Sequence, residues 1–396
     1  MGCISGTWSR RFIIAGLSVT GLALLGAQNF ALAEEPIKVG LVAALSGQSA
    51  KSGEAITRGL TIAIDEINSA GGIKGRKIEL VARDDESNPG KGLLAARELV
   101  QREKVAALFG GLDTPVSLAI VPFANQSKVP FIGVWAAGTN ITRNGADDNY
   151  VFRVSAVDAN VGEALVDYAL DKKGAKKPGL ILINNPWGES NEHALLDALK
   201  KRNVTAAGVE KFENNDVDVV PQLTRLKQAG ADALFLVANV APASQVVKSL
   251  DRMGWDVPVV SHWGVSGGRF TELGGPRTEK VDFIQTFIFA KEQPKKATDL
   301  FDKLKAKFGV NSFVDVMPAT GIANSYDAMH LLALALANAD PKDGKSVRDA
   351  LYGIDKYDGL IKNYNKPFSK ENHDALNAKD YIFAHFVKGE ILPLGK

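Results

Sequence analysis

The sequence is almost free of cysteine and contains few histidines. Its 396 residues include one cysteine, Cys3, and five histidines. Disulfide scaffolds, thiolate zinc sites and iron–sulfur clusters all need several cysteines, so the composition excludes them. Four of the histidines lie far apart in the chain, without the spacing of metal ligands: His193, His330, His373 and His385. We therefore expect no metal and no cofactor.

The sequence also lacks an excess of charge of either sign. Lysine and arginine together number 47, and aspartate and glutamate number 45. A nucleic-acid binder that relies on a basic surface needs a clear positive excess, so we expect no nucleic-acid partner. With 45% hydrophobic residues the chain has enough apolar material for a packed core, and its length predicts two domains.

The apolar run near the start of the chain is too short for a membrane-spanning helix. It extends from Phe12 to Ala27, is interrupted by glycines, and falls short of the roughly 20 residues that a spanning helix needs. Arg10 and Arg11 precede it, and Ala31-Leu32-Ala33 has the small-x-small pattern of a signal peptidase site. We predict a signal peptide over residues 1–33, cleaved after Ala33, and a periplasmic protein. A retained membrane anchor is the alternative that the interruptions disfavour.

From Ile37 onward the apolar pattern alternates between strand-like runs and helical spacing. The run Ile37–Leu45 is followed by Ile56, Leu60 and Ile64 at helical spacing, and Gly71-Gly72 then ends the helix. Units of this kind repeat with short connections, first to Trp135 and then in a second series to Ser261. Such repetition is typical of parallel βαβ construction. The sequence therefore predicts an α/β fold of two doubly wound parallel-sheet lobes.

The loops after the predicted strands are the places to look for a ligand site, because open α/β sheets bind ligands at the carboxyl ends of their strands. Asp113 and Thr114 start a predicted helix, where free N–H groups and a hydroxyl can accept a carboxylate. The alternative is that either side chain merely caps that helix. The segment Ala136–Asn140 offers a second hydroxyl with backbone donors, or an ordinary Gly-Asn turn.

Tryptophans mark the ends of three predicted strands. Trp135, Trp187 and Trp263 fall there and predict stacking walls for a ligand, although packing between the lobes would place them in the same way. His262, beside Trp263, is a candidate hydrogen-bond donor in the cleft.

Two catalytic interpretations are disfavoured. The segment Gly264–Gly268 matches the G-x-S-x-G nucleophile elbow around Ser266, but that elbow must open a long helix, and Gly274-Gly275-Pro276 ends this one early. A nicotinamide dehydrogenase needs G-x-G-x-x-G in the first strand–helix turn, and Leu45–Ser49 lacks it. We therefore expect no enzyme.

A set of short motifs in a fixed order carries a resemblance. Ile37-Lys38-Val39-Gly40, Ala44-Leu45-Ser46-Gly47, Gly71-Gly72-Ile73-Lys74-Gly75, and Asp84-Asp85 with Asn88-Pro89 resemble the periplasmic leucine/isoleucine/valine-binding family of ABC importers. The resemblance extends from about Ile37 to the C-terminus. It implies a type I periplasmic binding fold with three hinge crossings, near Ser155, Phe289 and Tyr381. It also implies a monomer that serves an ABC permease and ATPase.

The resemblance also implies the division of the chain into lobes. Lobe I would comprise residues 34–155 and 290–380, and lobe II residues 156–289 and 381–396. A receptor that feeds a sensor kinase would have the same architecture, and the chain itself does not separate the two roles.

Site residues follow from the resemblance position by position. It places the family's carboxylate-binding loop on Leu112, Asp113 and Thr114, its second small-residue loop on Ala137, Gly138 and Thr139, and its aromatic residue on Trp187. In amino-acid binders of the family, an acid and a tyrosine receive the α-ammonium. By resemblance, the corresponding positions of this chain are Trp263 and the region of Asn239.

The loss of that acid argues against an amino-acid ligand, because a buried ammonium without a carboxylate is costly. We therefore hypothesise a small organic carboxylate as the solute, aromatic acids included. The hydroxyls of Thr114 and Thr139 would hold its carboxylate, and Trp187 and Trp263, with Trp135 as the third candidate wall, would hold its body. A branched-chain amino acid or an amide remains the alternative, with Asp113 receiving the amine.

Overall fold

The computed structural model describes residues 35–395. The predicted signal peptide and its cleavage site lie outside the described residues. Within the described part of the chain, no helix has the length and apolarity that crossing a membrane requires.

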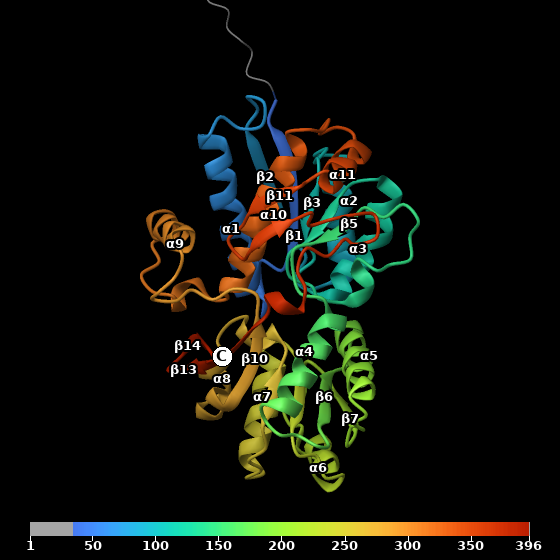
Figure 1. The fold of residues 1–396 in the computed structure, drawn as a ribbon, viewed down its shortest axis with the longest axis vertical. Helices are drawn as coiled ribbons and strands as arrows, with labels where there is room; N and C mark the ends of the chain where they lie inside the picture. Colours follow the sequence, from blue (N-terminus) through green and yellow to red (C-terminus); the bar gives the residue numbers. More distant parts are fainter. Residues whose placement is uncertain (1–34, 396) are drawn as a thin grey trace, which may run out of the picture. The chain divides into compact units, whose positions relative to one another are not determined.

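The first sheet has five strands, all parallel, in the order β2-β1-β3-β4-β5. Its strands are β1 (Ile37–Ala43), β2 (Ile78–Asp84), β3 (Leu108–Gly110), β4 (Phe131–Gly133) and β5 (Val151–Arg153). The helices around it in Figure 1 are α1 (Ala50–Ser69), α2 (Pro89–Gln101), α3 (Thr114–Ser127), α10 (Ala319–Leu336) and α11 (Gly344–Tyr352).

Alternate side chains of these strands pack into two separate cores. Leu41 and Phe109 belong to a core that includes α1 and α10, whereas Val42 and Leu108 belong to a second core that includes α2 and α3. Because successive side chains of a strand point to opposite faces, helices cover the first sheet on both faces. A sheet covered in this way leaves only its strand ends open to a ligand.

The second sheet has seven strands in the order β14-β13-β10-β9-β8-β6-β7. They are β6 (Gly179–Ile183), β7 (Val209–Phe212), β8 (Leu234–Val237), β9 (Val259–Ser261), β10 (Val281–Gln285), β13 (Ile382–Val387) and β14 (Glu390–Pro393). The helices beside it are α4 (Asp158–Asp171), α5 (Pro186–Lys201), α6 (Val220–Gln228), α7 (Val240–Arg252) and α8 (Phe270–Gly274). Strands β13 and β14 are antiparallel to their neighbours, and the other pairs are parallel.

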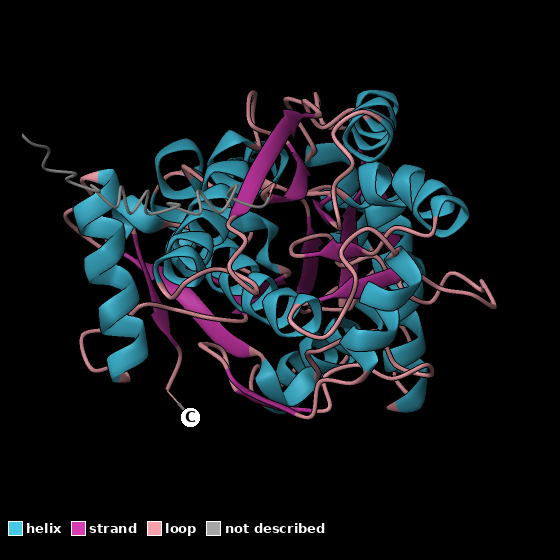
Figure 2. Cartoon of the chain, turned by 90° about the horizontal axis from the view of Figure 1, so that it is seen from above, coloured by secondary structure: helices cyan, strands magenta, loops and turns pink. Residues whose placement is uncertain are grey.

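The chain passes between the two sheets three times. It leaves the first sheet after β5, returns after β10 through α9 (Lys295–Phe308) and α10, and leaves again before β13. In the view from above, helices lie on several sides of the strands (Figure 2). The predicted α/β fold with two doubly wound sheets is confirmed.

The structure adds details that the sequence pattern did not indicate. The apolar pattern that starts at Val204 predicts a longer strand there, but β7 begins only at Val209. A two-stranded hairpin of β11 (Lys356–Asp358) and β12 (Asn363–Asn365) was not predicted. Its strands are short and mostly polar, and Tyr364 is held through its hydroxyl to the buried Asp327 at 2.9 Å. A long-range contact of this kind leaves no local periodic signal.

A half-buried carboxylate, that of Glu66, joins three helices beside the first sheet. Glu66 of α1 accepts hydrogen bonds from Tyr326 Oη at 2.7 Å and His330 Nε2 at 3.1 Å, both on α10. Lys303 of α9 binds its other oxygen at 2.6 Å. Burial alone would raise the pKa of Glu66, but the hydrogen bonds from His330, Lys303 and Tyr326 outweigh it and lower the pKa to about 2.

We predict that Glu66→Gln destabilises the protein by about 1–3 kcal/mol at neutral pH, because it removes a charged hydrogen-bond acceptor. Since the folded-state pKa is depressed, this stabilisation is present above about pH 4.5 and is lost as the pH falls toward about 2. Urea unfolding at a series of pH values measures both effects. Glu272→Gln, in an exposed pair with Arg269, is the control and should keep the wild-type profile. An unchanged acid limb in Glu66→Gln would contradict the prediction.

Candidate ligand-binding cleft

A polar cavity lies where the carboxyl ends of the two sheets meet. Its volume is about 500 Å³. Loops that follow β1, β2 and β3 supply Ser46, Gly47, Gln48, Ser49, Glu86, Ser87, Pro89, Asp113 and Pro115, and loops that follow β6, β7 and β8 supply Asn185, Pro186, Trp187, Asn214, Asn215, Asn239, Val240, Ala241 and Pro242, with Ile183 at the end of β6. Lysine and arginine are absent from this lining. The cavity thus lies at the carboxyl ends of the strands, where open α/β sheets are expected to bind ligands.

Two helices direct their N-termini at this cleft without a side-chain cap. Asp113 occupies the cap position of α3 and Asn239 that of α7, yet neither side chain accepts a hydrogen bond from its own helix. Instead, Asn239 Nδ2 donates to Asp113 Oδ1 at 3.1 Å, which joins the two sheets across the cleft. The alternative that Asp113 merely caps its helix is therefore wrong. The first-turn N–H groups of both helices stay without a side-chain cap, which leaves donors for an anion.

Asp113 keeps one carboxylate oxygen, Oδ2, buried and without a hydrogen-bond partner among the described residues. Burial raises the pKa of this carboxyl, and hydrogen bonds from Ser87 and Asn239 oppose part of that rise. A carboxyl in this state is ready to receive a donor, or to donate its own proton once protonated.

The two threonines of the predicted carboxylate loops hold their backbone surroundings in place. Thr114 Oγ1 accepts from the N–H of Gly138 at 3.3 Å, and Thr139 Oγ1 accepts from the N–H of Ala159 at 3.1 Å. A side chain at Gly138 would lie 2.4 Å from Thr114 Cγ2, so the close approach requires glycine. Both hydroxyls act as acceptors in these bonds, which leaves the proton of each free to be donated.

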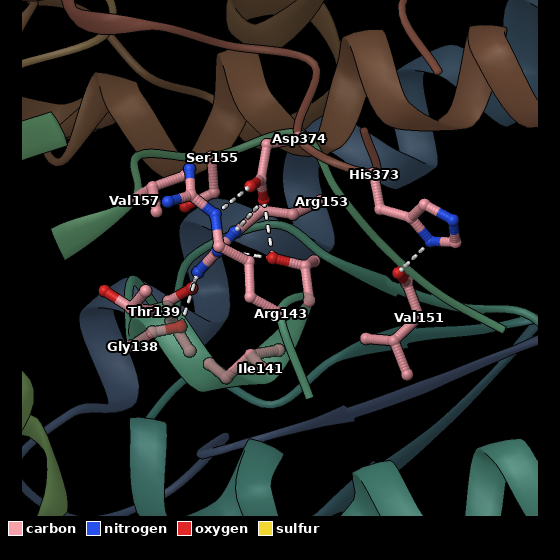
Figure 3. Close-up of polar contacts among 12 residues, drawn as sticks. Gly138, Thr139, Ile141, Arg143, Val151, Arg153, Ser155, Val157, His373 and Asp374 are labelled. Atoms are coloured by element: carbon pink, nitrogen blue, oxygen red, sulfur yellow. Dashed lines mark hydrogen bonds and ion pairs between the residues drawn. The ribbon is translucent and has the colours of Figure 1, made fainter. Parts of the chain in front are cut away.

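The second loop is fixed from behind by the guanidinium of Arg153, the last residue of β5. Arg153 is fully buried and donates to the carbonyl of Gly138 at 2.8 Å, to Thr142 Oγ1 at 2.6 Å and to Asp374 Oδ1 at 2.8 Å (Figure 3). Thr142 also donates to Asp374, at 2.7 Å. Because the carbonyl of Gly138 is turned to Arg153, the position of the loop between β4 and β5 depends on this ion pair.

The same contact with Arg153 keeps the carboxyl of Asp374 ionised. Burial works to raise the pKa of Asp374, but Arg153, Thr142 and the half-exposed Arg143 together hold it below the usual range. The neighbouring His373 is bound through Nδ1 to the carbonyl of Val151 and through Nε2 to Tyr352 Oη (Figure 3 shows the first of these contacts). The segment around Asp374 is thereby attached to the end of the first sheet.

The aromatic candidates gather behind the cavity. The rings of Trp135 and Trp263 lie 5.5 Å apart, one from each sheet, and both are buried. His262 packs edge-on against Trp187 at 5.1 Å and against Trp263 at 5.4 Å. Trp135 and Trp263 thus pack between the two sheets, which was the alternative to stacking on a ligand. Trp187 also lines the cavity.

Asp158, which the sequence analysis missed, lies at the centre of these residues. Its Oδ1 accepts from His262 Nε2 at 3.0 Å and from Trp187 Nε1 at 3.3 Å, and its backbone N–H donates to the carbonyl of Ala137 at 2.8 Å. His262 Nδ1 accepts from the N–H of Trp263 at 2.8 Å, so the proton of His262 is on Nε2. An acid at the start of a helix resembles an ordinary first-turn residue, so the sequence offered no signal for this role.

The structure therefore divides the predicted site residues into two groups. Three of them line the cavity: Asp113, Trp187 and Asn239. The others are outside its lining and pack beside it: Leu112, Thr114, Trp135, Ala137, Gly138, Thr139, His262 and Trp263, of which all but Thr139 are buried. Sequence reasoning also missed Asp85, which is fully buried, and Arg153.

The region around Ser266 does not have the geometry of a nucleophile elbow. Trp263–Ser266 form a 3-10 turn, and the buried Ser266 hydroxyl donates to the carbonyl of Trp263 at 2.7 Å. The helix that follows, α8, has only 5 residues. The disfavoured hydrolase interpretation thus has no support here. No cluster of three potential metal-ligating side chains occurs within residues 35–395.

Two α/β halves with a polar cleft at their strand ends define a two-lobed solute-binding protein. The sequence profile of the family described as periplasmic binding protein matches residues 36–389, and the chain belongs to that family. It is accordingly a binding protein and not an enzyme.

Three similar proteins illustrate the relationship. A Leu/Ile/Val-binding protein homolog of Brucella melitensis is 29% identical over 84% of this chain and 90% of its own length. A branched-chain amino acid transporter substrate binding protein of Streptococcus pneumoniae, solved with isoleucine, superposes with a TM-score of 0.77 at 26% identity, covering 91% of this chain and 100% of that one. A solute binding protein of R. palustris, solved with 4-hydroxybenzoate, gives 0.76 at 20% identity, covering 91% and 95%.

We predict that Arg153→Met costs about 3–5 kcal/mol of stability, because it leaves the carboxylate of Asp374 buried without its cation. It should also weaken solute binding, since the loop that carries Gly138 loses its anchor. Arg143→Met is the matched control, because it removes the half-exposed partner of the same carboxylate and should cost far less. Urea unfolding of both variants checks this, and equal losses would show that the buried pair has no special role.

The carboxyl of Asp85 gives a prediction of the opposite pH dependence to that of Glu66. Burial raises its pKa to about 7 against the hydrogen bond from the N–H of Ser87, and the nearby Asp113 and Asp84 add to the rise. Because the folded-state pKa is raised, stability falls as the pH rises from about 4, the ordinary pKa of an aspartate, to about 7, above which the loss is complete. We expect Asp85→Asn to remove this loss between about pH 4 and about pH 7, as measured by urea unfolding. Asp147→Asn, at an exposed carboxyl, is the control and should keep the wild-type loss of stability. The same loss in Asp85→Asn would contradict the prediction.

Proposed function

We propose that the protein captures a small carboxylate-bearing solute, aromatic acids included, in the cleft and delivers it to the permease and ATPase of an ABC importer of the branched-chain amino acid type. The observation that carries the proposal is the pair of helix N-termini, those of α3 and α7, that face the cleft without side-chain caps. Such ends favour a carboxylate through their free N–H groups and the helix dipole. The hydroxyls of Thr114 and Thr139 add two further donors.

Aromatic side chains support the choice of an aromatic or otherwise flat solute. Trp187 lines the cavity, and Trp135 and Trp263 pack behind it. Trp263 falls where the family resemblance places an acid in amino-acid binders, so the expected partner of an α-ammonium is replaced by a flat apolar ring. The likeness to a protein solved with 4-hydroxybenzoate indicates that the same fold accommodates an aromatic carboxylate.

Delivery would depend on the closure of the two lobes. We propose lobe I as residues 34–155 and 290–380 and lobe II as 156–289 and 381–396, with hinges near Ser155, Phe289 and Tyr381. Contacts such as Asn239 with Asp113 and Ser190 with the N–H of Thr139 join the lobes and would favour a closed form around the solute. We further propose that the protein acts as a monomer in the periplasm after removal of residues 1–33.

A branched-chain amino acid or an amide is the second candidate. The unpartnered oxygen of Asp113 favours it, because a buried carboxylate gains most from an ammonium or amide donor. The names of several relatives, such as the leucine-, isoleucine-, valine-, threonine- and alanine-binding protein of Pseudomonas aeruginosa, agree with this candidate.

A thermal-shift screen tests the proposal. Protein stripped of bound solute by unfolding and refolding is heated with amino acids, amides, and aliphatic and aromatic carboxylates. A ligand at 100 times its dissociation constant stabilises the folded state by about 2.7 kcal/mol. We expect stabilisation by carboxylates and a loss of about tenfold in affinity in Thr114→Val, with exposed Thr205→Val as the control. Stabilisation by amides alone, or by no carboxylate, would overturn the proposal.

A further inference from the structure

Lysines gather at the end of the second sheet that is opposite the cleft. The loop between α4 and β6 carries Lys172, Lys173, Lys176 and Lys177, and the last turn of α6 carries Lys227. All of these residues are exposed. We call them together the lysine patch.

The two segments that carry the lysine patch are held against each other. Strands β6 and β8 are parallel neighbours, so the loops that precede them lie at the same end of the sheet. The N–H groups of Lys176 and Lys177 donate to the carboxylate of Asp232, just before β8, at 2.7 and 2.9 Å. The ammonium of Lys177 donates to the carbonyl of Ala229, directly after α6, at 2.8 Å. The patch is therefore one surface.

Carboxylates at this end of the sheet compensate only part of the positive charge. Asp282 is buried and pairs with Lys173, and Asp232 accepts from two backbone N–H groups of the patch. The other acids nearby pair with cations outside the patch: Asp171 with Arg202, and Asp256 with Lys280. The patch thus keeps an excess of positive charge. Within residues 35–395, most of its lysines form no ion pair: Lys172, Lys176, Lys177 and Lys227.

A tryptophan lies beside the patch. Trp255, in the loop between α7 and β9, is half-buried, and the ammonium of Lys227 is 5.9 Å from the centre of its ring. Arg277 donates to the carbonyl of Trp255 at 2.5 Å and so holds this loop in place. Tryptophan and lysine together are typical of surfaces that contact the headgroup region of a membrane, because the ring suits the apolar boundary and the ammonium suits the phosphates.

We propose that the lysine patch binds the surface of a membrane that contains anionic phospholipid, with its ammonium groups on the lipid phosphates. An extended anionic surface fits the patch better than a single small anion, because the lysines come from two segments and all are exposed. In the periplasm, where we propose that the protein acts, membranes supply such a surface.

This contact goes beyond the proposed function and does not depend on which solute fills the cleft. The cleft is lined by loops that follow β6, β7 and β8, at the carboxyl ends of the strands, whereas the patch is at the amino ends of β6 and β8. A membrane bound at the patch therefore leaves the cleft accessible to solute. The contact would keep the protein close to a membrane while the cleft is loaded.

Vesicle binding tests the proposal. The protein is used in the processed form proposed above, because the apolar run Phe12–Ala27 would bind lipid by itself. It is floated with vesicles of phosphatidylglycerol and, separately, with vesicles of phosphatidylcholine. We expect binding to phosphatidylglycerol alone, and loss of that binding in about 1 M salt, where the screening length falls to about 3 Å.

Matched double variants assign the binding to the patch. Each lysine near an anionic surface contributes a factor of about five to the affinity, so Lys172→Gln with Lys176→Gln should weaken binding about twenty-five-fold. Lys291→Gln with Lys370→Gln removes the same charge from exposed positions outside the patch and should retain binding. Exposed lysines contribute little to folding, and thermal unfolding of both variants checks that they are folded.

The remaining outcomes overturn the proposal. Equal binding to both kinds of vesicle, absence of binding to phosphatidylglycerol, or equal losses in the two double variants would each contradict it. Binding of soluble polyphosphate without binding of vesicles would replace the membrane by a soluble polyanion. Stabilisation by carboxylates in the thermal-shift screen should be unchanged in Lys172→Gln with Lys176→Gln, so failure of this inference leaves the proposed function in place.

Discussion

The buried pair of Arg153 and Asp374 is the interaction on which the arrangement of the cleft depends. Arg153 ends β5, where the chain first leaves the first sheet, and Asp374 precedes the segment that returns to the second sheet. The same guanidinium holds the carbonyl of Gly138. One cation therefore fixes two passages between the sheets and one wall of the site. Removing either partner would leave the other charge buried and unpaired, so the arrangement depends on both residues.

The cleft combines donors of the backbone with acceptors of the side chains. The N-termini of α3 and α7 offer N–H groups, whereas Asp113, Asp158 and the asparagines of the lining offer oxygens. An anion alone would use only the first set, and a cation alone only the second. The cleft thus places backbone donors and side-chain acceptors close together, as small-molecule sites commonly do.

Polar and aromatic contacts join the two halves of the molecule. Asn239 reaches Asp113, Ser52 donates to the carbonyl of Gly267 at 3.3 Å, and Trp135 packs on Trp263. Interfaces of this kind are weaker than a lobe's own core, in which strand residues such as Leu41 and Phe109 are completely buried.

The sequence by itself determined the α/β class, the alternation of strands and helices and the two doubly wound sheets. These follow from local periodicity, since apolar spacing along the chain sets whether a segment is a strand or a helix. The pairing of Asp113 with Asn239 and the gathering of His262 and Trp187 around Asp158 were decided by the tertiary structure alone. Asp158 and His262 are 104 residues apart, and nothing in the spacing of such residues says which buried acceptor will find its donors in the folded protein.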